Sequence, residues 1–267
     1  MKFIIDTKST PVDIKLDLVS LKPENVIKTI VYDPITNDCL LERIDVLSGG
    51  KTVILKLPVN GKKTIIESFT QKNGRQPLGK DKSFEAKNIK VMPLKKYSVD
   101  LGSGDIEFME FIKNFSLDLP TLDDSSSIYK SPSGKFKIVL FPKLKSYSGE
   151  YINIPCMVGK KTGTIEVSKD YFMKLTVSQR IATLSHEYGH FYKNPLMGLE
   201  IGDEFGADLN GLTVYLGSGY GLSEYLNAFK KVFKGARTDQ NRSRYDMMKK
   251  FAHKIQEGQY FTKPYNL

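Results

Sequence analysis

The stretch TVSQRIATLSHEYGHFYKN, residues 176–194, decides how this chain is interpreted. The chain holds three histidines, and two of them, His186 and His190, stand in this stretch four residues apart. Glu187 follows the first of them directly. This concentration of imidazole and carboxylate groups raises two alternatives, a metal site or a surface helix with incidental histidines.

An amphipathic helix is the local structure that this stretch predicts. Thr176 or Ser178 precedes the run and can cap its first turn, and the pair Asn194-Pro195 is expected to end it. The side chains that we expect on the inner face of this helix are Ile181, Leu184, Ser185, Tyr188 and Tyr192.

On such a helix the two histidines can bind one metal ion. Residues four apart are separated by roughly 40° around the axis and about 6 Å along it, so His186 and His190 can each point one ring nitrogen at the same ion. Glu187 then lies beside the ion without binding it. This is the H-E-x-x-H pattern of zinc metallopeptidases, in which zinc lowers the pKa of a water to near 7 and the glutamate acts as base.

A third protein ligand is expected from the segment DEFGAD, residues 203–208. Metzincins place a histidine six residues after the second one, and here Leu196 stands at that position. Glu204 and Asp208 share one face of a helix. In gluzincin peptidases a glutamate on the following helix binds the ion, and an aspartate four residues later holds a histidine ring. Glu204 and Asp208 resemble that pair, which implies that Glu204 binds the ion and that Asp208 accepts the far N–H of His186 and fixes its tautomer.

Two other carboxylates compete with Glu204 for the ion. Glu200 lies one helical turn earlier, but it lacks the alanine and aspartate that follow Glu204. Asp203 points about 100° away from Glu204 on a helix. We therefore expect His186, His190 and Glu204 to be the metal ligands.

With these motifs, the chain resembles the gluzincin peptidases, and among them the family of HtpX and the CAAX prenyl proteases. The E-x-x-A-D signature of that family is matched by Glu204, Ala207 and Asp208. An apolar helix and a glycine–tyrosine pair follow the signature here, as they do in the family. The resemblance covers roughly residues 105–250 and implies a zincin-like α+β metallopeptidase domain that holds Zn²⁺.

The resemblance also implies how a polypeptide substrate binds. The family has an edge strand reading roughly N-A-F-A before its H-E-x-x-H helix, and the segment NIPCMV stands in that place here. Asn153 matches the asparagine of that strand, whereas Pro155 and Cys156 depart from the pattern. We expect the substrate to lie extended against residues 153–158, with Asn153 and Cys156 as substrate-binding residues.

Peptide hydrolysis also requires a group that stabilises the oxyanion. The candidates in and near the last helix are Arg242, Arg244, Tyr245, His253 and Tyr220. Arg244 aligns best with a late arginine of the family. The catalytic residues that we expect are therefore Glu187 and Arg244.

Two departures from the family imply a minimal relative without membrane helices. No apolar run approaches the 18 or so residues of a membrane span. The distance along the chain from His190 to Glu204 is 14 residues, far shorter than in the membrane enzymes. Small zinc peptidases of this type are encoded by tailed bacteriophages, some as virion components, and the resemblance implies such a setting here.

The remainder of the chain predicts an α+β protein with two domains. Residues 1–97 hold short runs rich in Val, Ile and Thr, separated by turn formers, which is typical of an antiparallel β-sandwich or barrel. The strands that these runs predict span residues 1–6, 12–20, 26–33, 39–47, 51–59, 63–71 and 88–97. No cluster of chemical groups marks this region, so we expect an accessory or docking domain. Residues 98–104 look like a linker, and residues 105–267 predict the zincin-like metallopeptidase domain, with helices near residues 105–117, 201–217, 223–235 and 241–258.

Composition limits the partners and the compartment. The net charge is +10, but it is spread along the chain and no dense basic run with aromatics marks a nucleic-acid groove. Cys39 and Cys156 form no pattern, which fits a reducing compartment. The N-terminus reaches Asp6 too soon for a secretory signal. We expect a cytoplasmic or virion-associated protein that binds neither nucleic acid nor membrane and whose β-rich domain contacts virion or other proteins.

The leading functional hypothesis is a zinc-dependent endopeptidase of the gluzincin type. The first alternative is a non-enzymatic phage virion structural or assembly protein that retains the zinc-binding zincin fold as a scaffold. The second is a metal-dependent regulator that cleaves one partner, such as a repressor. The replacement Glu187→Gln discriminates between enzyme and scaffold, because only an enzyme needs the base.

Overall fold

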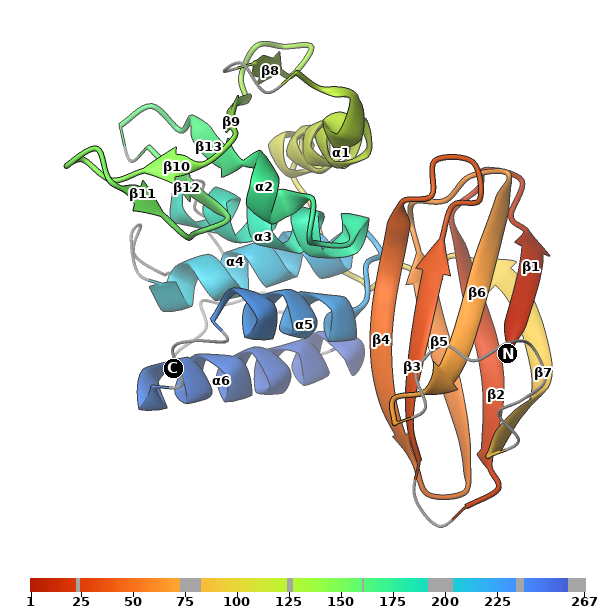
Figure 1. Ribbon diagram of the computed structural model, residues 1–267. Coiled ribbons are helices and arrows are strands. Elements are labelled where there is room, and N and C mark those ends of the chain that lie inside the picture. Colours follow the sequence, from red (N-terminus) through yellow and green to blue (C-terminus); the bar gives the residue numbers. More distant parts are fainter. Residues whose placement is uncertain are drawn as a thin grey trace. The chain divides into compact units, whose positions relative to one another are not determined.

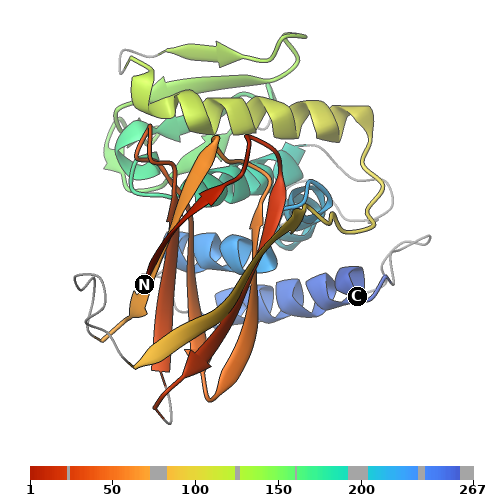
Figure 2. The ribbon, with the colours of Figure 1, turned by 90° about the vertical axis from the view of Figure 1, so that its right-hand side faces the viewer.

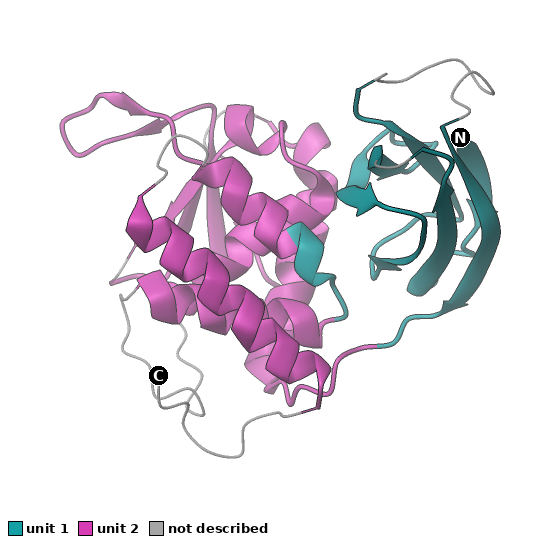
Figure 3. Cartoon of the chain, turned by 90° about the horizontal axis from the view of Figure 1, so that it is seen from below, with its two compact units in different colours: residues 1–95, 219–224 teal, residues 96–218, 225–267 magenta. Residues whose placement is uncertain are grey.

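The computed structural model describes residues 1–22, 25–72, 83–123, 127–159, 161–191, 204–233 and 238–258. The chain divides into two compact units, one of residues 1–95 with 219–224 and the other of residues 96–218 with 225–267 (Figure 3). Antiparallel sheets occupy the N-terminal part and helices dominate the C-terminal part, so the expected α+β class is confirmed at this level.

Antiparallel strands build the first unit (Figure 1). Their bounds are β1 Lys2–Asp6, β2 Val12–Ser20, β3 Asn25–Tyr32, β4 Cys39–Leu47, β5 Gly50–Leu57, β6 Lys63–Thr70 and β7 Phe84–Pro93. One sheet has the order β1-β6-β3-β4 and the other β5-β2-β7, and the two lie face to face (Figure 2). Alternate apolar side chains are buried between them, such as Leu16 of β2 and Ile27 of β3, as strand periodicity requires. The described strands thus form a sandwich of two sheets rather than one closed ring.

The last strand of this unit differs from the prediction. The apolar run suggested a strand near residues 88–97, but β7 spans Phe84–Pro93. Its pairing with β2 extends to Phe84 opposite Ser20, after a register shift at Asp17/Leu18. Phe84 is buried, so hydrophobic burial at the start of the strand and this irregular pairing set the boundary.

A small mixed sheet lies in the second unit. Its strands are β8 Ile128–Lys130, β9 Lys137–Phe141, β12 Cys156–Val158 and β13 Ile165–Ser168, and a separate hairpin is formed by β10 Leu144–Lys145 and β11 Tyr151–Ile152. The order is β12-β13-β9-β8, with β13 parallel to β9 and the other pairs antiparallel. β12 is therefore an edge strand. The turn to β13 is closed by the Gly159 N–H, which donates to the Thr164 carbonyl at 2.9 Å.

Helices dominate the rest of the second unit. They are α1 Ser103–Asp118, the 3-10 helix η1 Leu119–Thr121, α2 Lys169–Phe172, α3 Val177–Phe191, α4 Glu204–Gly217, α5 Leu222–Val232 and α6 Asp239–Gln256. The first three residues of α5, 222–224, belong to the first unit. None of the helices in the described ranges is both long enough and apolar enough to cross a bilayer.

α3 begins with a capping box. The Thr176 hydroxyl accepts from the Gln179 N–H at 3.2 Å, and the Gln179 amide oxygen accepts from the Thr176 N–H at 3.2 Å. Thr176 rather than Ser178 is therefore the capping residue. The expected end of the helix at Asn194-Pro195 and the inner-face residue Tyr192 lie outside the described residues.

α1 starts earlier than predicted and turns one side chain outward. Its first residue is Ser103, which lies inside the expected linker. Asp105, the third residue of the helix, accepts a hydrogen bond of 3.0 Å from the Gly102 N–H. Ile106, an apolar residue in the first turn, is 53% exposed. The reason is geometric, because Ile106 lies about 160° around the helix axis from the buried Phe108.

Candidate metal centre

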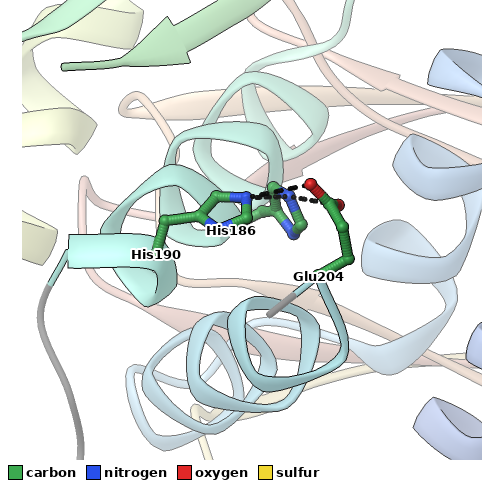
Figure 4. Close-up of side chains that lie close together, drawn as sticks. All are labelled: His186, His190 and Glu204. Carbon is green, nitrogen blue, oxygen red and sulfur yellow. Dashed lines mark hydrogen bonds and ion pairs between the residues drawn. The ribbon is translucent and has the colours of Figure 1, made fainter. Parts of the chain in front are cut away.

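Three potential ligand side chains converge where α3 meets α4 (Figure 4). His186 and His190 project from α3, and Glu204 is the first residue of α4. The Nε2 atoms of the two histidines are 3.1 Å apart. Each lies 3.5 Å from an oxygen of the Glu204 carboxylate. The ligand atoms of the three residues all lie within 4.8 Å of one another, so the structure brings together the three ligands that the sequence suggested.

These spacings fit a single small cation. Two nitrogens bound to one tetrahedral zinc at 2.0–2.1 Å lie about 3.3 Å apart, and a nitrogen and a carboxylate oxygen lie at a similar separation. The observed distances of 3.1 and 3.5 Å bracket that value. Two imidazole nitrogens with one carboxylate are also a donor set that zinc accepts, so the residues present fit the ion.

Asp208 fixes the orientation of the first histidine. Its Oδ1 lies 2.9 Å from Nδ1 of His186, on the side of the ring away from His190 and Glu204. Asp208 lies one helical turn after Glu204 on α4 and its side chain is 2% exposed. A hydrogen on Nδ1 donates to this carboxylate, which leaves Nε2 free to bind a metal.

Arg244 of α6 connects the two carboxylates. Its Nε donates to Oδ2 of Asp208 at 2.6 Å and its Nη2 donates to Oδ1 at 3.0 Å. Nη2 also lies 2.9 Å from Oε2 of Glu204, and the side chain is 4% exposed. The guanidinium packs over the rings of Phe229 and Phe233, 5.1 and 4.8 Å from their centres. These contacts place Arg244 behind the ligands, and its expected catalytic role stays a prediction.

The other oxyanion candidates, Arg242, Tyr245, His253 and Tyr220, are not among the residues that line the cavity beside His186, His190 and Glu204. Arg242 is exposed and pairs with Asp239, and His253 is exposed and pairs with Glu257. The competing carboxylates Glu200 and Asp203 lie outside the described residues.

Charge interactions hold the side chains of this cluster together. Burial opposes protonation of His186, but its hydrogen bonds to Asp208 and Glu204 prevail and raise its pKa to about 10. The hydrogen bond from His186, together with the nearby positive charges, lowers the pKa of Glu204 to about 2. Burial and the charge on His186 lower the pKa of His190. A proton on His186 therefore supplies the positive charge that an ion would bring.

Glu187 lies beside the cluster on a different side of α3. Its carboxylate is buried, and burial raises its pKa. Oε1 lies 3.5 Å from the sulfur of Cys156, and the backbone N–H of Val158 also hydrogen-bonds to the carboxylate. The group that the sequence suggested as base is thus held against the edge strand β12.

A cavity of about 500 Å³ opens onto His186, His190 and Glu204. Its polar wall includes the ligands, Glu187, Asp208 and Arg244, and its apolar walls come from β12 with the segment before it, from α3 and from α5. The apolar residues contributed by α5 and the residue directly after it are Ala228, Phe229, Val232 and Phe233. Cys156 lines this cavity, whereas Asn153 is exposed and is not one of the lining residues.

Two glycines that the sequence reasoning missed bring α3 and α4 together. A Cβ on Gly189 would lie 2.3 Å from the Ala207 carbonyl oxygen, and one on Gly211 would lie 2.5 Å from the Ser185 carbonyl oxygen. The helix backbones therefore touch at both points. Gly189 stands inside H-E-Y-G-H. A glycine at this position, which has no side chain, is the signal in that motif that another backbone comes close.

Comparison of the chain with protein-family models, with curated proteins and with solved structures found no match in any of the three.

Proposed function

We propose that this protein is a zinc-dependent endopeptidase whose second unit is a zincin-like domain. The observation that carries the proposal is the arrangement around His186. Its Nε2 faces His190 and Glu204, its Nδ1 is held by Asp208, and Glu187 follows it on the same helix. A structural helix pair has no need of two imidazoles and a carboxylate that face one another at ligand spacing.

Zn²⁺ bound by His186, His190 and Glu204 would supply a lowered pKa for water and polarisation of a carbonyl oxygen. Glu187 takes the proton of the attacking water and later delivers it to the leaving amine nitrogen. The raised pKa that burial gives Glu187 suits a group that must both accept and return a proton near neutral pH. Asp208 keeps His186 in the tautomer that binds metal, and Arg244 holds Asp208 and Glu204 in place.

A polypeptide is the substrate that the surroundings favour. β12 pairs with β13 on one side, and in the described sheet it has no ladder partner on the other. An extended chain can add to such an edge by main-chain hydrogen bonds. The aromatic and aliphatic walls of the cavity favour a substrate with a bulky apolar side chain near the cleaved bond.

A second candidate function is a virion structural or assembly protein that keeps the zinc centre as a scaffold. The observation that favours it is the first unit, a β-sandwich in which the described residues form no group of metal-ligating side chains. Exposed apolar side chains on β4 and β5, including Ile44, Val46 and Ile54, suit a docking role. This second proposal includes the bacteriophage setting that the resemblance implies.

A peptide-library assay with three samples tests the proposal. Wild-type protein with zinc should cleave peptides, while Glu187→Gln with zinc and wild type with a chelator should not. Loss of a general base typically lowers the rate about 10²–10⁴-fold. Glu187→Gln should keep its zinc, because Glu187 is not one of the ligands. Cleavage that survives both Glu187→Gln and chelation would refute the metallopeptidase proposal, and an inactive zinc-loaded wild type would favour the scaffold.

A further inference from the structure

The thiol of Cys156 points at the carboxylate of Glu187. Sγ lies 3.5 Å from Oε1, within the range of a hydrogen bond to sulfur, and both residues line the cavity at the metal centre. Cys156 is the first residue of β12 and is 5% exposed. The same strand supplies a second donor, because the backbone N–H of Val158 also bonds to Glu187. One edge strand therefore contributes two donors to one carboxylate.

The direction of the Cys156–Glu187 bond follows from the chemistry of the two groups. Burial, and then the negative charge of Glu187, raise the pKa of the Cys156 thiol well above its usual range. The sulfur therefore keeps its hydrogen at neutral pH, and a thiol with a hydrogen can donate to a carboxylate. A buried thiol of raised pKa is also a poor nucleophile, so this position suits a hydrogen-bond donor rather than a reactive cysteine.

We propose that Cys156 is a positioning residue, whose S–H donates to Oε1 of Glu187 and, with the Val158 N–H, holds this carboxylate in the orientation for proton transfer. The inference rests on the proposed peptidase function for its catalytic meaning. A carboxylate on a helix can rotate about its side-chain bonds, and two donors from β12 restrict that rotation. The remaining lone pairs of Glu187 are then left for the attacking water of the proposed reaction. Cys156 itself exchanges no proton with the substrate.

Replacement of Cys156 tests the positioning role by activity. We expect Cys156→Ala to lower kcat about 10-fold, within the range for residues that orient a metal site, and to leave KM and zinc content unchanged. Cys156→Ser retains a donor and should recover most of kcat. Cys39→Ser is the matched control, since Cys39 lies on β4 in the first unit. Unchanged kcat in Cys156→Ala, or a loss that Cys156→Ser does not recover, would overturn the proposal.

A second measurement needs no substrate. In a Cys39→Ser background, the only thiol is that of Cys156, and its alkylation by iodoacetamide can be followed by mass spectrometry. Glu187→Gln replaces the carboxylate by a neutral amide, so the thiol should ionise more readily and react several-fold faster. Equal alkylation rates with Glu187 and with Gln would show that the thiol does not bond to the carboxylate and would overturn the proposal. Absence of peptide cleavage by the wild type would instead count against the peptidase function, and the alkylation rates alone would then decide the contact.

Discussion

Gly189 lies directly against the backbone of Ala207, so that a Cβ at Gly189 would come within 2.3 Å of the Ala207 carbonyl oxygen. The glycine stands between the two ligand histidines, and the alanine stands between Glu204 and Asp208. The contact therefore joins the two halves of the candidate metal centre. The distance between the backbones of α3 and α4 determines whether Glu204 reaches the histidines.

Gly189→Ala should damage the metal centre without touching a ligand. The added methyl group has no room, so α4 must shift, and overpacking of this kind costs about 1–3 kcal/mol of unfolding free energy. We also expect zinc affinity to fall about 10-fold or more, as measured by competition with a chromophoric chelator. Gly50→Ala is the control, because a Cβ there meets no atom closer than 4.0 Å. Equal zinc affinity in Gly189→Ala and wild type would refute this role of the contact.

Glu204→Ala should abolish stoichiometric zinc binding. Its carboxylate supplies the third ligand, and two histidines alone leave the ion bound by too few protein groups. Metal content of purified protein, measured by atomic emission, should fall from one zinc per chain to well below one. Glu110→Ala, which removes an exposed carboxylate of α1, should keep full content. Full content in Glu204→Ala would move the third ligand to Glu200 or Asp203.

Arg244→Met should destabilise the protein, whereas Arg242→Met should not. Among the described residues, removal of the guanidinium leaves the buried Asp208 with His186 as its one charged partner, and breaking a buried pair costs about 3 kcal/mol. Arg242 lies on the same helix and is exposed, so its replacement should stay within about 0.5 kcal/mol of wild type. Urea unfolding in the presence of chelator measures both. Similar unfolding free energies of the two variants would contradict a stabilising role for the contact between Arg244 and Asp208.

The stability of the chelated protein should fall as the pH rises above neutrality. His186 has its pKa raised from 6.5 to about 10 by Asp208 and Glu204, against the effect of burial. A raised pKa stabilises the folded state fully below about pH 6.5, and this stabilisation is lost as the pH rises through about 10. Unfolding free energies of wild type and His186→Gln between pH 6 and pH 10 test this. The unfolding free energy should decline with pH in the wild type and not in His186→Gln. Parallel curves for the two proteins would contradict this role of His186.

A fragment of residues 98–267 should fold and bind zinc without the β-sandwich. All ligands and both groups that orient them, Asp208 and Arg244, belong to the second unit. The fragment should bind one zinc per chain, as measured by metal analysis, and should show a cooperative thermal transition. An unfolded fragment that holds no zinc would mean that the two units depend on each other.

The sequence predicted those parts of the site that lie close together along one helix. The four-residue spacing of His186 and His190, and that of Glu204 and Asp208, follows directly from helical geometry. Alternation of apolar residues likewise located β2 to β6 within one or two residues. These features are local, so a single sequence carries enough information to place them.

Contacts between distant segments could not be predicted in this way. Arg244 reaches Asp208 across 36 residues, and Cys156 reaches Glu187 across 31, with no periodic pattern to link either pair. The parallel pairing of β13 with β9 was also missed, because strand patterns do not specify the partner. Tertiary packing, rather than local preference, decides each of these contacts.

The carboxylate of Asp208 joins an imidazole of α3 to a guanidinium of α6, although it belongs to α4. The Asp208 side chain thus links α3, α4 and α6 next to the proposed metal ligands. Loading of the ion should therefore be felt well beyond its ligands. The backbone amides of α6 should exchange their hydrogens for deuterium more slowly in the zinc-loaded protein than in the chelated one, while those of β2 should exchange at the same rate in both. The amide exchange rate of α6 would then report whether zinc is bound to the ligands of α3 and α4.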